Sequence, residues 1–306
     1  MAGAVAIHGD RDPRVAPGLD GLRAGRWDAV IDTSGYVPRI VEASSALLHP
    51  LAGRYLFVSS LSVLAKPDRP GLDELAEVAT LDPPDSEDVS RHYGALKAAC
   101  ERVIVRAFDE RATIVRPGLI VGPYDSTDRF GYWPARFVHP ELLGDRAGHA
   151  VVPAPRERAI QCIDARDLAA WMLDLCEGDR GGTFNAASPA SHWTFGDLVD
   201  TCMAAASSPP EPVWVDEATL EPFHVAPWVG LPLWLPASEN DHAGFLHIDT
   251  QRAMQAGLVT RPLSQTVADT AAWLATRDNR HAWQHVLSDA RERQILSALK
   301  RAAHVR

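Results

Sequence analysis

Apolar and polar positions follow two alternating patterns in the first half of the chain. Short apolar runs typical of buried strands occur at Ala4–Ile7, Trp27–Ile31, Tyr55–Val58 and Ala112–Arg116. Between them, apolar residues recur at helical spacing from Pro38 to Leu51 and from Tyr93 to Phe108, and a weaker helix is predicted at 16–24. Alternating strands and helices predict an α/β fold, with a parallel sheet and helices on both of its faces.

The second half is less regular and predicts a smaller, mixed α/β lobe. Strands are expected at 158–163, 182–186, 213–215 and 245–249, and helices at 130–137, 164–176, 194–206, 250–256, 264–276 and 282–302. The predicted domains are a Rossmann-like unit at 1–125 to which 158–180 return, a substrate-binding lobe at 126–157 and 181–276, and a C-terminal helical tail at 277–306.

Composition narrows the classes of function. The chain has 306 residues and a formal net charge of −10, which gives no basic surface for nucleic acid or an anionic membrane. No apolar run reaches the roughly 18 residues that span a bilayer, and no signal segment is recognisable, so a cytoplasmic protein is expected. The four cysteines form no C-x-x-C pair and the twelve histidines no H-E-x-x-H pair, so no metal site is predicted.

The candidate chemistry lies in the helix that contains Tyr93 and Lys97. These residues are four apart, so their side chains leave the same face of the helix. At about 4 Å and an effective dielectric of about 20, the attraction of an ammonium for a phenolate is roughly 4 kcal/mol, or about three pKa units. The pattern therefore predicts a tyrosine that works as an acid or base, with Ser60 reaching the same substrate oxygen from the end of a strand. The alternative interpretation is that Tyr93 and Lys97 are only part of the surface of an ordinary amphipathic helix.

Gly35, Ser60 and Gly118 all follow predicted strands, at the edge where ligands bind to parallel sheets. The segments that carry these residues resemble, taken together, one known family. They are Gly9–Arg11, Asp32–Gly35, Phe57–Ser60, Tyr93–Lys97, Arg116–Pro123 and Ile163–Ala169. From His8 to about Thr276 the chain resembles the extended, or atypical, short-chain dehydrogenase/reductase superfamily, in the branch called NAD-dependent epimerase/dehydratase.

The resemblance implies a role for each matching position. Ser60 would orient the substrate oxygen, Tyr93 would give or take its proton, and Lys97 would lower the tyrosine pKa and hold a ribose. The implied cofactor is NAD or NADP, and the implied partners are a small-molecule substrate and a second copy of the chain, docked through the helices at 38–51 and 93–108. The implied cofactor-binding residues are Asp10 and Arg11 at the adenine end, and Thr33, Ser34, Gly35, Pro117, Gly118, Leu119 and Ile120 around the nicotinamide and its ribose.

The chain departs from the family at its start. The family opens with a strand, a G-x-x-G-x-x-G turn and a helix that hold the dinucleotide pyrophosphate, and this sequence shows none of them. Losing two or three charge-assisted hydrogen bonds would weaken cofactor binding by on the order of 10³–10⁵-fold. Either a natural short form or a start codon placed too far downstream explains the gap. The N-terminally incomplete sheet would leave the strand from Trp27 with an open edge that Ala4–Ile7 could cover.

Three functions remain open from the sequence. The first is an NAD(P)-dependent oxidoreductase or epimerase acting on a sugar nucleotide or another small hydroxy or keto compound, with Tyr93 as acid/base. The second is a cofactor-independent isomerase, dehydratase or cyclase that uses the same pocket, and the third is a non-catalytic ligand-binding protein. The aromatic segments Phe130–Trp133 and Pro222–Trp234 are expected on the substrate side or in the core of the smaller lobe.

Overall fold

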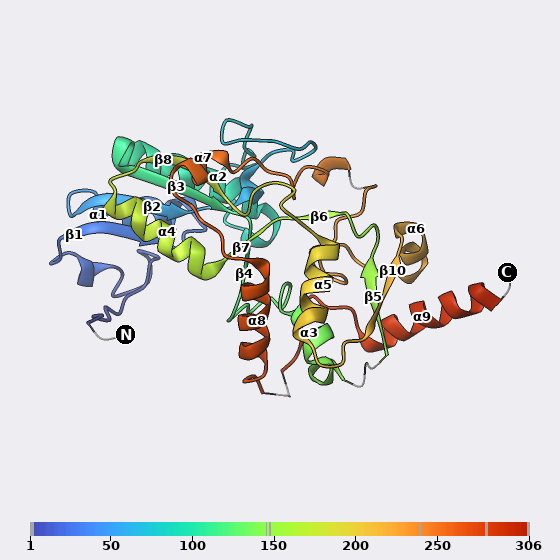
Figure 1. Ribbon diagram of the computed structural model, residues 1–306. Helices are drawn as coiled ribbons and strands as arrows, with labels where there is room; N and C mark the ends of the chain where they lie inside the picture. Colours follow the sequence, from blue (N-terminus) through green and yellow to red (C-terminus); the bar gives the residue numbers. More distant parts are fainter. Residues whose placement is uncertain (1–2, 145, 147, 239, 279–280, 305–306) are drawn as a thin grey trace.

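The computed structural model describes residues 3–144, 146, 148–238, 240–278 and 281–304. Its main sheet has four strands in the order β1-β2-β3-β8, and all three pairings are parallel. The strands are β1 (Trp27–Asp32), β2 (Ala52–Val58), β3 (Ala112–Pro117) and β8 (Gly182–Ala186). The predicted Rossmann-like α/β architecture is therefore confirmed (Figure 1).

Helices cover both faces of this sheet, as the continuous apolar run in β2 predicts. On one face, Tyr55 and Phe57 pack against α1 (Pro38–Leu48) and α2 (Val89–Phe108). On the other face, Leu56 and Val58 pack against α4 (Ala165–Glu177). Because strand side chains alternate between faces, successive residues of β2 enter two separate cores.

The N-terminal segment differs from the prediction. Residues 4–7 form no strand, and Val5 is 85% exposed. The predicted helix at 16–24 is reduced to a short 3₁₀ turn at Asp20–Leu22, because Pro17 and the neighbouring glycines disfavour a longer helix. In the part of the chain that the structure describes, β1 pairs with β2 alone, so its outer edge has no neighbouring strand.

A second lobe lies beyond the carboxyl ends of the sheet strands (Figure 1). Its apolar core joins a parallel strand pair to four helices, and Trp133, Phe137 and Phe195 are fully buried in it. The pair is β5 (His149–Pro153) with β10 (Glu211–Val215), and the helices are α3 (Tyr132–Val138), α5 (Phe195–Ala205), α8 (Leu263–Leu274) and α9 (Asp289–His304).

The fold also contains shorter strands and helices. The parallel pair β4 (Leu119–Val121) with β7 (Cys162–Asp164), the antiparallel pair β6 (Ala159–Ile160) with β9 (Trp193–Thr194), and the helices α6 (Glu217–Leu220) and α7 (Gln251–Gln255) complete the fold. No described helix is both long and apolar enough to cross a membrane.

Three features of the second half differ from expectation. The segment 245–249 forms no strand: a turn and a bend cover 245–247, and 248–249 are irregular. β8 joins the main sheet, although the sequence assigns 181–276 to the smaller lobe. The last helix begins at Asp289 and not near 282, and it is part of the lobe, because Glu292 and Ile295 are buried. Glu292 accepts hydrogen bonds from Arg136 and from the backbone of Val151.

Candidate active site

A cavity of about 560 Å³ lies at the carboxyl ends of the sheet strands. It contains all three predicted catalytic residues, Ser60, Tyr93 and Lys97. The predicted cofactor residues in its wall are Thr33, Pro117, Gly118, Leu119 and Ile120. The other lining residues are Tyr36, Val58, Ser59, Ser62, Thr127, Arg129, Trp228 and Phe245. Segments far apart in the sequence therefore meet in one cavity, in the way that the order of strands and helices predicts.

The position of Tyr93 depends on the close packing of α2 against the turn after β2. Asp88 begins the helix by accepting hydrogen bonds from the backbone of Ser90 and Arg91. A Cβ atom at Gly94 would lie 2.0 Å from the carbonyl oxygen of Ser62, so only glycine permits this approach. The contact brings Tyr93 beside Ser60, whose hydroxyl accepts a hydrogen bond from Ser62 N at 3.1 Å.

Tyr93 is a protonated phenol in this environment. Burial raises its pKa above the usual value, the interaction with Ser60 lowers it by less, and Tyr36 raises it further. The rings of Tyr36 and Tyr93 lie 6.3 Å apart. The predicted lowering of the tyrosine pKa by Lys97 is therefore wrong for this state of the protein, because desolvation dominates.

Lys97 is bound to the backbone and is only 2% exposed. Its Nζ donates hydrogen bonds to the carbonyl oxygens of Gly35 at 2.9 Å and Val58 at 2.5 Å. The ammonium also lies 4.3 Å from the centre of the Phe57 ring. Burial lowers the pKa of Lys97 to about 8. The lysine thus joins the loop after β1 to the end of β2, two segments that form the cavity wall.

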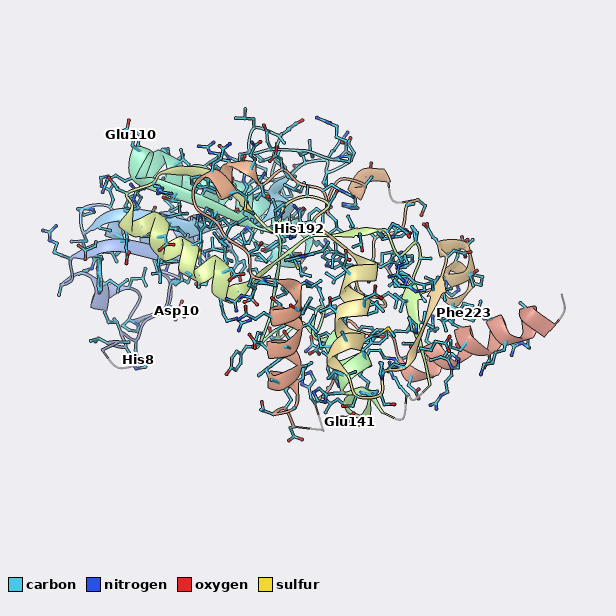
Figure 2. All side chains as sticks on the ribbon, viewed as in Figure 1. His8, Asp10, Glu110, Glu141, His192 and Phe223 are labelled. Carbon is cyan, nitrogen blue, oxygen red and sulfur yellow. The ribbon has the colours of Figure 1, made fainter. Side chains whose placement is uncertain are left out.

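Two further predicted cofactor residues lie apart from this cavity. Arg11 makes a bidentate ion pair with Asp32, at 2.5 and 2.7 Å, and also donates to Ser34 Oγ. Arg11 lines a different cavity of about 480 Å³, between the N-terminal segment and α1. Asp10 accepts a hydrogen bond from the backbone of Asp12, and Figure 2 shows it near His8 in the N-terminal loops. Of the predicted loop 33–35, Thr33 reaches the cavity and Gly35 contributes its carbonyl to Lys97.

A buried ion pair contacts the residue that precedes Ser60. Arg116 on β3 binds Glu101 on α2 through two hydrogen bonds, at 2.9 and 2.7 Å, and both residues are nearly inaccessible. Glu101 also accepts a hydrogen bond from Ser59, at 2.5 Å. The network therefore connects β3 and α2 to the residue that precedes Ser60.

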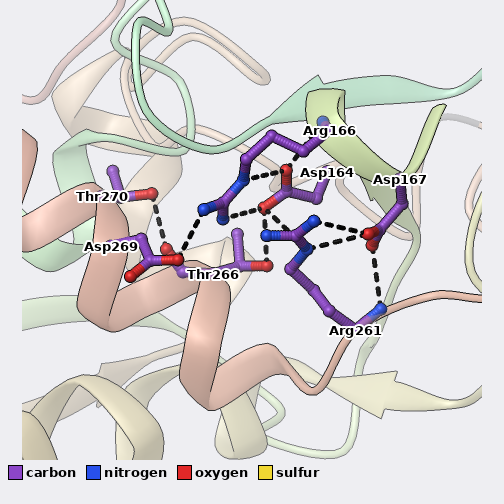
Figure 3. Close-up of polar contacts among 7 residues, drawn as sticks. All are labelled: Asp164, Arg166, Asp167, Arg261, Thr266, Asp269 and Thr270. Carbon is purple, nitrogen blue, oxygen red and sulfur yellow. Dashed lines mark hydrogen bonds and ion pairs between the residues drawn. The ribbon is translucent and has the colours of Figure 1, made fainter. Parts of the chain in front are cut away.

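The motif that begins at Asp164 has a structural role. Figure 3 shows Asp164 between Arg166 and Arg261, with Arg166 extending to Asp269 on α8. Burial opposes ionisation of Asp164, but hydrogen bonds from Arg166 and Thr266 hold its pKa below the usual value. These contacts hold α4 of the Rossmann-like part against α8 of the second lobe.

Sequence reasoning missed part of the cavity wall. Phe130 and Trp133 are fully buried, so the first aromatic segment packs in the core, which is one of its two predicted places. In the second aromatic segment, Trp228 reaches the cavity and contacts Phe245 edge-to-face at 5.9 Å. These two residues and Ser62 also line an adjoining cavity of about 630 Å³ with a mainly apolar wall. Arg129 carries no motif, and only its place soon after a strand end could have identified it.

The donor set of the cavity fits the nicotinamide and ribose half of a dinucleotide. Thr33, Ser60 and Tyr93 offer hydroxyl groups, and residues 117–120 form an apolar wall beside them. As far as the described residues go, no strand, glycine turn and helix precede β1, so the site shows no cradle for the pyrophosphate. In the same described residues, no group of histidine, cysteine or carboxylate side chains is arranged to hold a metal ion.

Fold and site together define a Rossmann-like protein with a cavity at the carboxyl ends of its sheet strands, lined by both polar and apolar residues. No family model and no curated protein matches the sequence. Solved structures do match the fold. A Burkholderia cenocepacia protein assigned as an epimerase is 17% identical, with 81% of this chain and 76% of that one covered, at a TM-score of 0.57.

Two sugar-nucleotide enzymes from Bacillus anthracis give similar matches. For dTDP-4-dehydrorhamnose reductase, solved with NADP, the identity is 15%, the coverage 82% and 81%, and the TM-score 0.54. For dTDP-glucose 4,6-dehydratase, solved with NAD, the identity is 12% and the TM-score is 0.53, with 82% of this chain and 73% of that one covered. The fold of this chain is therefore similar to those of the epimerase, reductase and dehydratase structures.

Proposed function

We propose that this protein is an NAD(P)-dependent oxidoreductase or epimerase of the short-chain type. The substrate would be a sugar nucleotide or another small compound with a hydroxyl or keto group. The observation that carries the proposal is the convergence of Ser60, Tyr93 and Lys97 in one cavity at the carboxyl ends of parallel strands. The fold shared with a reductase and a dehydratase solved with NADP and NAD supports it.

The protonation state of Tyr93 favours the role of proton donor. A phenol with a raised pKa remains neutral at physiological pH and can give its proton to a carbonyl oxygen that gains negative charge. Ser60 lies beside it and can hydrogen-bond the same oxygen. A nicotinamide dinucleotide, when bound, supplies or accepts a hydride.

Lys97 acts in this proposal as a positioning residue. Its hydrogen bonds to Gly35 and Val58 fix the two segments that flank Thr33 and Ser59. Thr33, Ser60 and the wall at 117–120 would hold the nicotinamide and its ribose.

A redox-neutral reaction is the second candidate. The observation that favours it is the segment before β1, which forms turns in the described chain and offers no pyrophosphate cradle. A neutral Tyr93 beside Ser60 could still protonate a leaving hydroxyl or an enolate. This candidate keeps the cavity and its acid but needs no dinucleotide.

The test follows oxidation of NADH and NADPH by absorbance with a panel of keto-bearing nucleotide sugars. Tyr93→Phe removes the proton donor and should lower kcat by about 10²–10⁴-fold. The matched control is Tyr124→Phe, because Tyr124 is exposed and does not line the cavity. Turnover that survives Tyr93→Phe would exclude the proposed role. Because an epimerase returns the hydride and causes no net oxidation, conversion of the sugars is also followed by chromatography, and conversion by protein free of dinucleotide, with none added, would favour the redox-neutral candidate.

A further inference from the structure

Arg129 is a cation in the cavity wall whose guanidinium group has no bonding partner among the residues that the structure describes. It follows β4 in the loop that leads to α3, and it shares the cavity with Tyr93. Its Nε atom is buried and unpaired. Among the described residues, none forms a hydrogen bond or an ion pair with its guanidinium group. A half-buried guanidinium usually finds such a partner, because desolvating an unpaired charge is unfavourable.

The backbone on both sides of Arg129 is nevertheless fixed. Asp128 is fully buried and accepts hydrogen bonds from Arg277 at 2.8 Å and from the backbone of Gln284 at 2.8 Å. His281 lies 2.9 Å from the same carboxylate. Phe130 donates its backbone N–H to Asp125 at 3.0 Å. The segment is therefore held rigidly, and the free guanidinium is not the result of a loosely packed loop.

Asp125 is the carboxylate that acts electrostatically on Arg129, and it is already engaged. Burial lowers the pKa of Arg129, and Asp125 raises it by less. One Asp125 oxygen accepts hydrogen bonds from Thr127 N at 2.9 Å and Thr127 Oγ1 at 2.6 Å, and the other accepts from Phe130 and Gly131. Asp125 thus organises the start of α3, and within the described parts of the chain the Arg129 charge has no close counter-ion.

The charge of the cavity lining also favours an anionic ligand. Its described lining residues include the cations Lys97 and Arg129 and no carboxylate, although the chain has a formal net charge of −10. A positive wall in an acidic protein favours an anionic ligand at this place. Lys97 already donates to two carbonyl groups, so Arg129 is the cation with free donors.

We propose that Arg129 binds an oxyanion of the substrate, either a phosphate or a carboxylate. Its planar donor fork matches both groups in a bidentate manner. The group belongs to the substrate because Arg129 shares the cavity with Trp228 and Phe245, which come from the long segment beyond β10 and not from the Rossmann-like strands. This inference rests on the proposed function only in taking the cavity as the active site.

Equilibrium binding tests the inference without turnover. Inorganic phosphate and acetate are titrated separately into the wild-type protein, and the amide NMR signals of residues 127–131 report the dissociation constants. Arg129→Gln should weaken binding about ten- to a hundredfold, the value of one charge-assisted hydrogen bond. Arg102→Gln is the control, because Arg102 is an exposed arginine of α2 outside the cavity. Unchanged spectra elsewhere in the protein show that the variant is folded.

The probe that binds more tightly identifies the oxyanion class. Equal binding by wild type and Arg129→Gln would overturn the inference, as would the absence of binding of both probes to the wild type. If Arg129→Gln loses anion binding and the wild type shows no nicotinamide-dependent turnover, the anion site stands and the proposed function is rejected.

Discussion

The two cations of the cavity lie in walls of different character. Lys97 comes from the helix that packs on the sheet, is nearly inaccessible, and donates to two backbone carbonyl groups. Arg129 comes from the loop before α3, and among the described residues it has no bonding partner. The difference separates a cation that stabilises the site from one that is available to a ligand. If this comparison is right, the stability cost of removing a cation should follow its number of protein partners.

The largest effect is expected for Arg116, the most completely paired buried cation near the site. Arg116→Gln leaves the buried carboxylate of Glu101 with Ser59 as its one remaining close donor among the described residues. Breaking a buried ion pair in this way should lower the free energy of unfolding by about 3–5 kcal/mol. Urea denaturation measures it, with exposed Arg102→Gln as control, and a loss no larger than that of the control would contradict the buried network.

Lys97→Met should have the next largest effect. The methionine fills a similar volume but leaves the carbonyl oxygens of Gly35 and Val58 without their donor. Each unpaired carbonyl should cost about 1–3 kcal/mol, and part of this cost is offset because the variant no longer buries a charge. The free energy of unfolding should therefore fall by about 2–4 kcal/mol. Lys66→Met, at an exposed lysine, is the comparison. Equal denaturation midpoints for the two variants would mean that Lys97 is not the structural cation described here.

The pH dependence of stability gives a smaller effect with a defined sign. Lys97 has a folded-state pKa lowered to about 8 from a model-peptide value near 10.4, so between these values the unfolded chain binds the extra proton. The stability of the wild type relative to Lys97→Met should therefore rise with pH through this window, by less than about 1.4 kcal/mol per pH unit. Urea melts at several pH values measure the difference, and a flat or falling difference would show that the lysine is not desolvated.

Arg129→Gln should have the smallest effect on stability. Because no described protein group loses a partner, the free energy of unfolding should change by no more than about 0.5 kcal/mol, or rise slightly as an unpaired charge is removed. The same denaturation experiment applies. A loss of several kcal/mol would reveal a protein partner for the guanidinium and end the contrast with Lys97.

The sequence predicts most of the Rossmann-like part because local pattern and tertiary environment agree there. The apolar run Tyr55–Val58 is a buried strand, Ser60 follows its end, and Tyr93 and Lys97 share a helix face. The segment Ala4–Ile7 fails as a strand because a short apolar run needs a neighbouring edge to pair with, which its own letters do not specify.

The electrostatics of the site could not be predicted in the same way. The spacing of Tyr93 and Lys97 suggested a pairwise attraction, but the burial of Tyr93 and the carbonyl partners of Lys97 come from residues distant in sequence. Gly94 and Arg129 were missed for the same reason. The importance of Gly94 lies in a backbone contact with Ser62, and that of Arg129 in the absence of a partner among the described residues.

The central claim is that the cavity with Ser60, Tyr93 and Lys97 is where a nicotinamide cofactor binds. Titration of NADH, followed by calorimetry, tests it with a variant that fills the cavity. Ile120→Trp places a large ring at a half-exposed position of the cavity wall, and Leu173→Trp makes a similar change at an exposed position of α4 outside it. The account predicts binding to the wild type and to Leu173→Trp, and its loss in Ile120→Trp. Binding that survives in Ile120→Trp, or that is absent from the wild type, would contradict it.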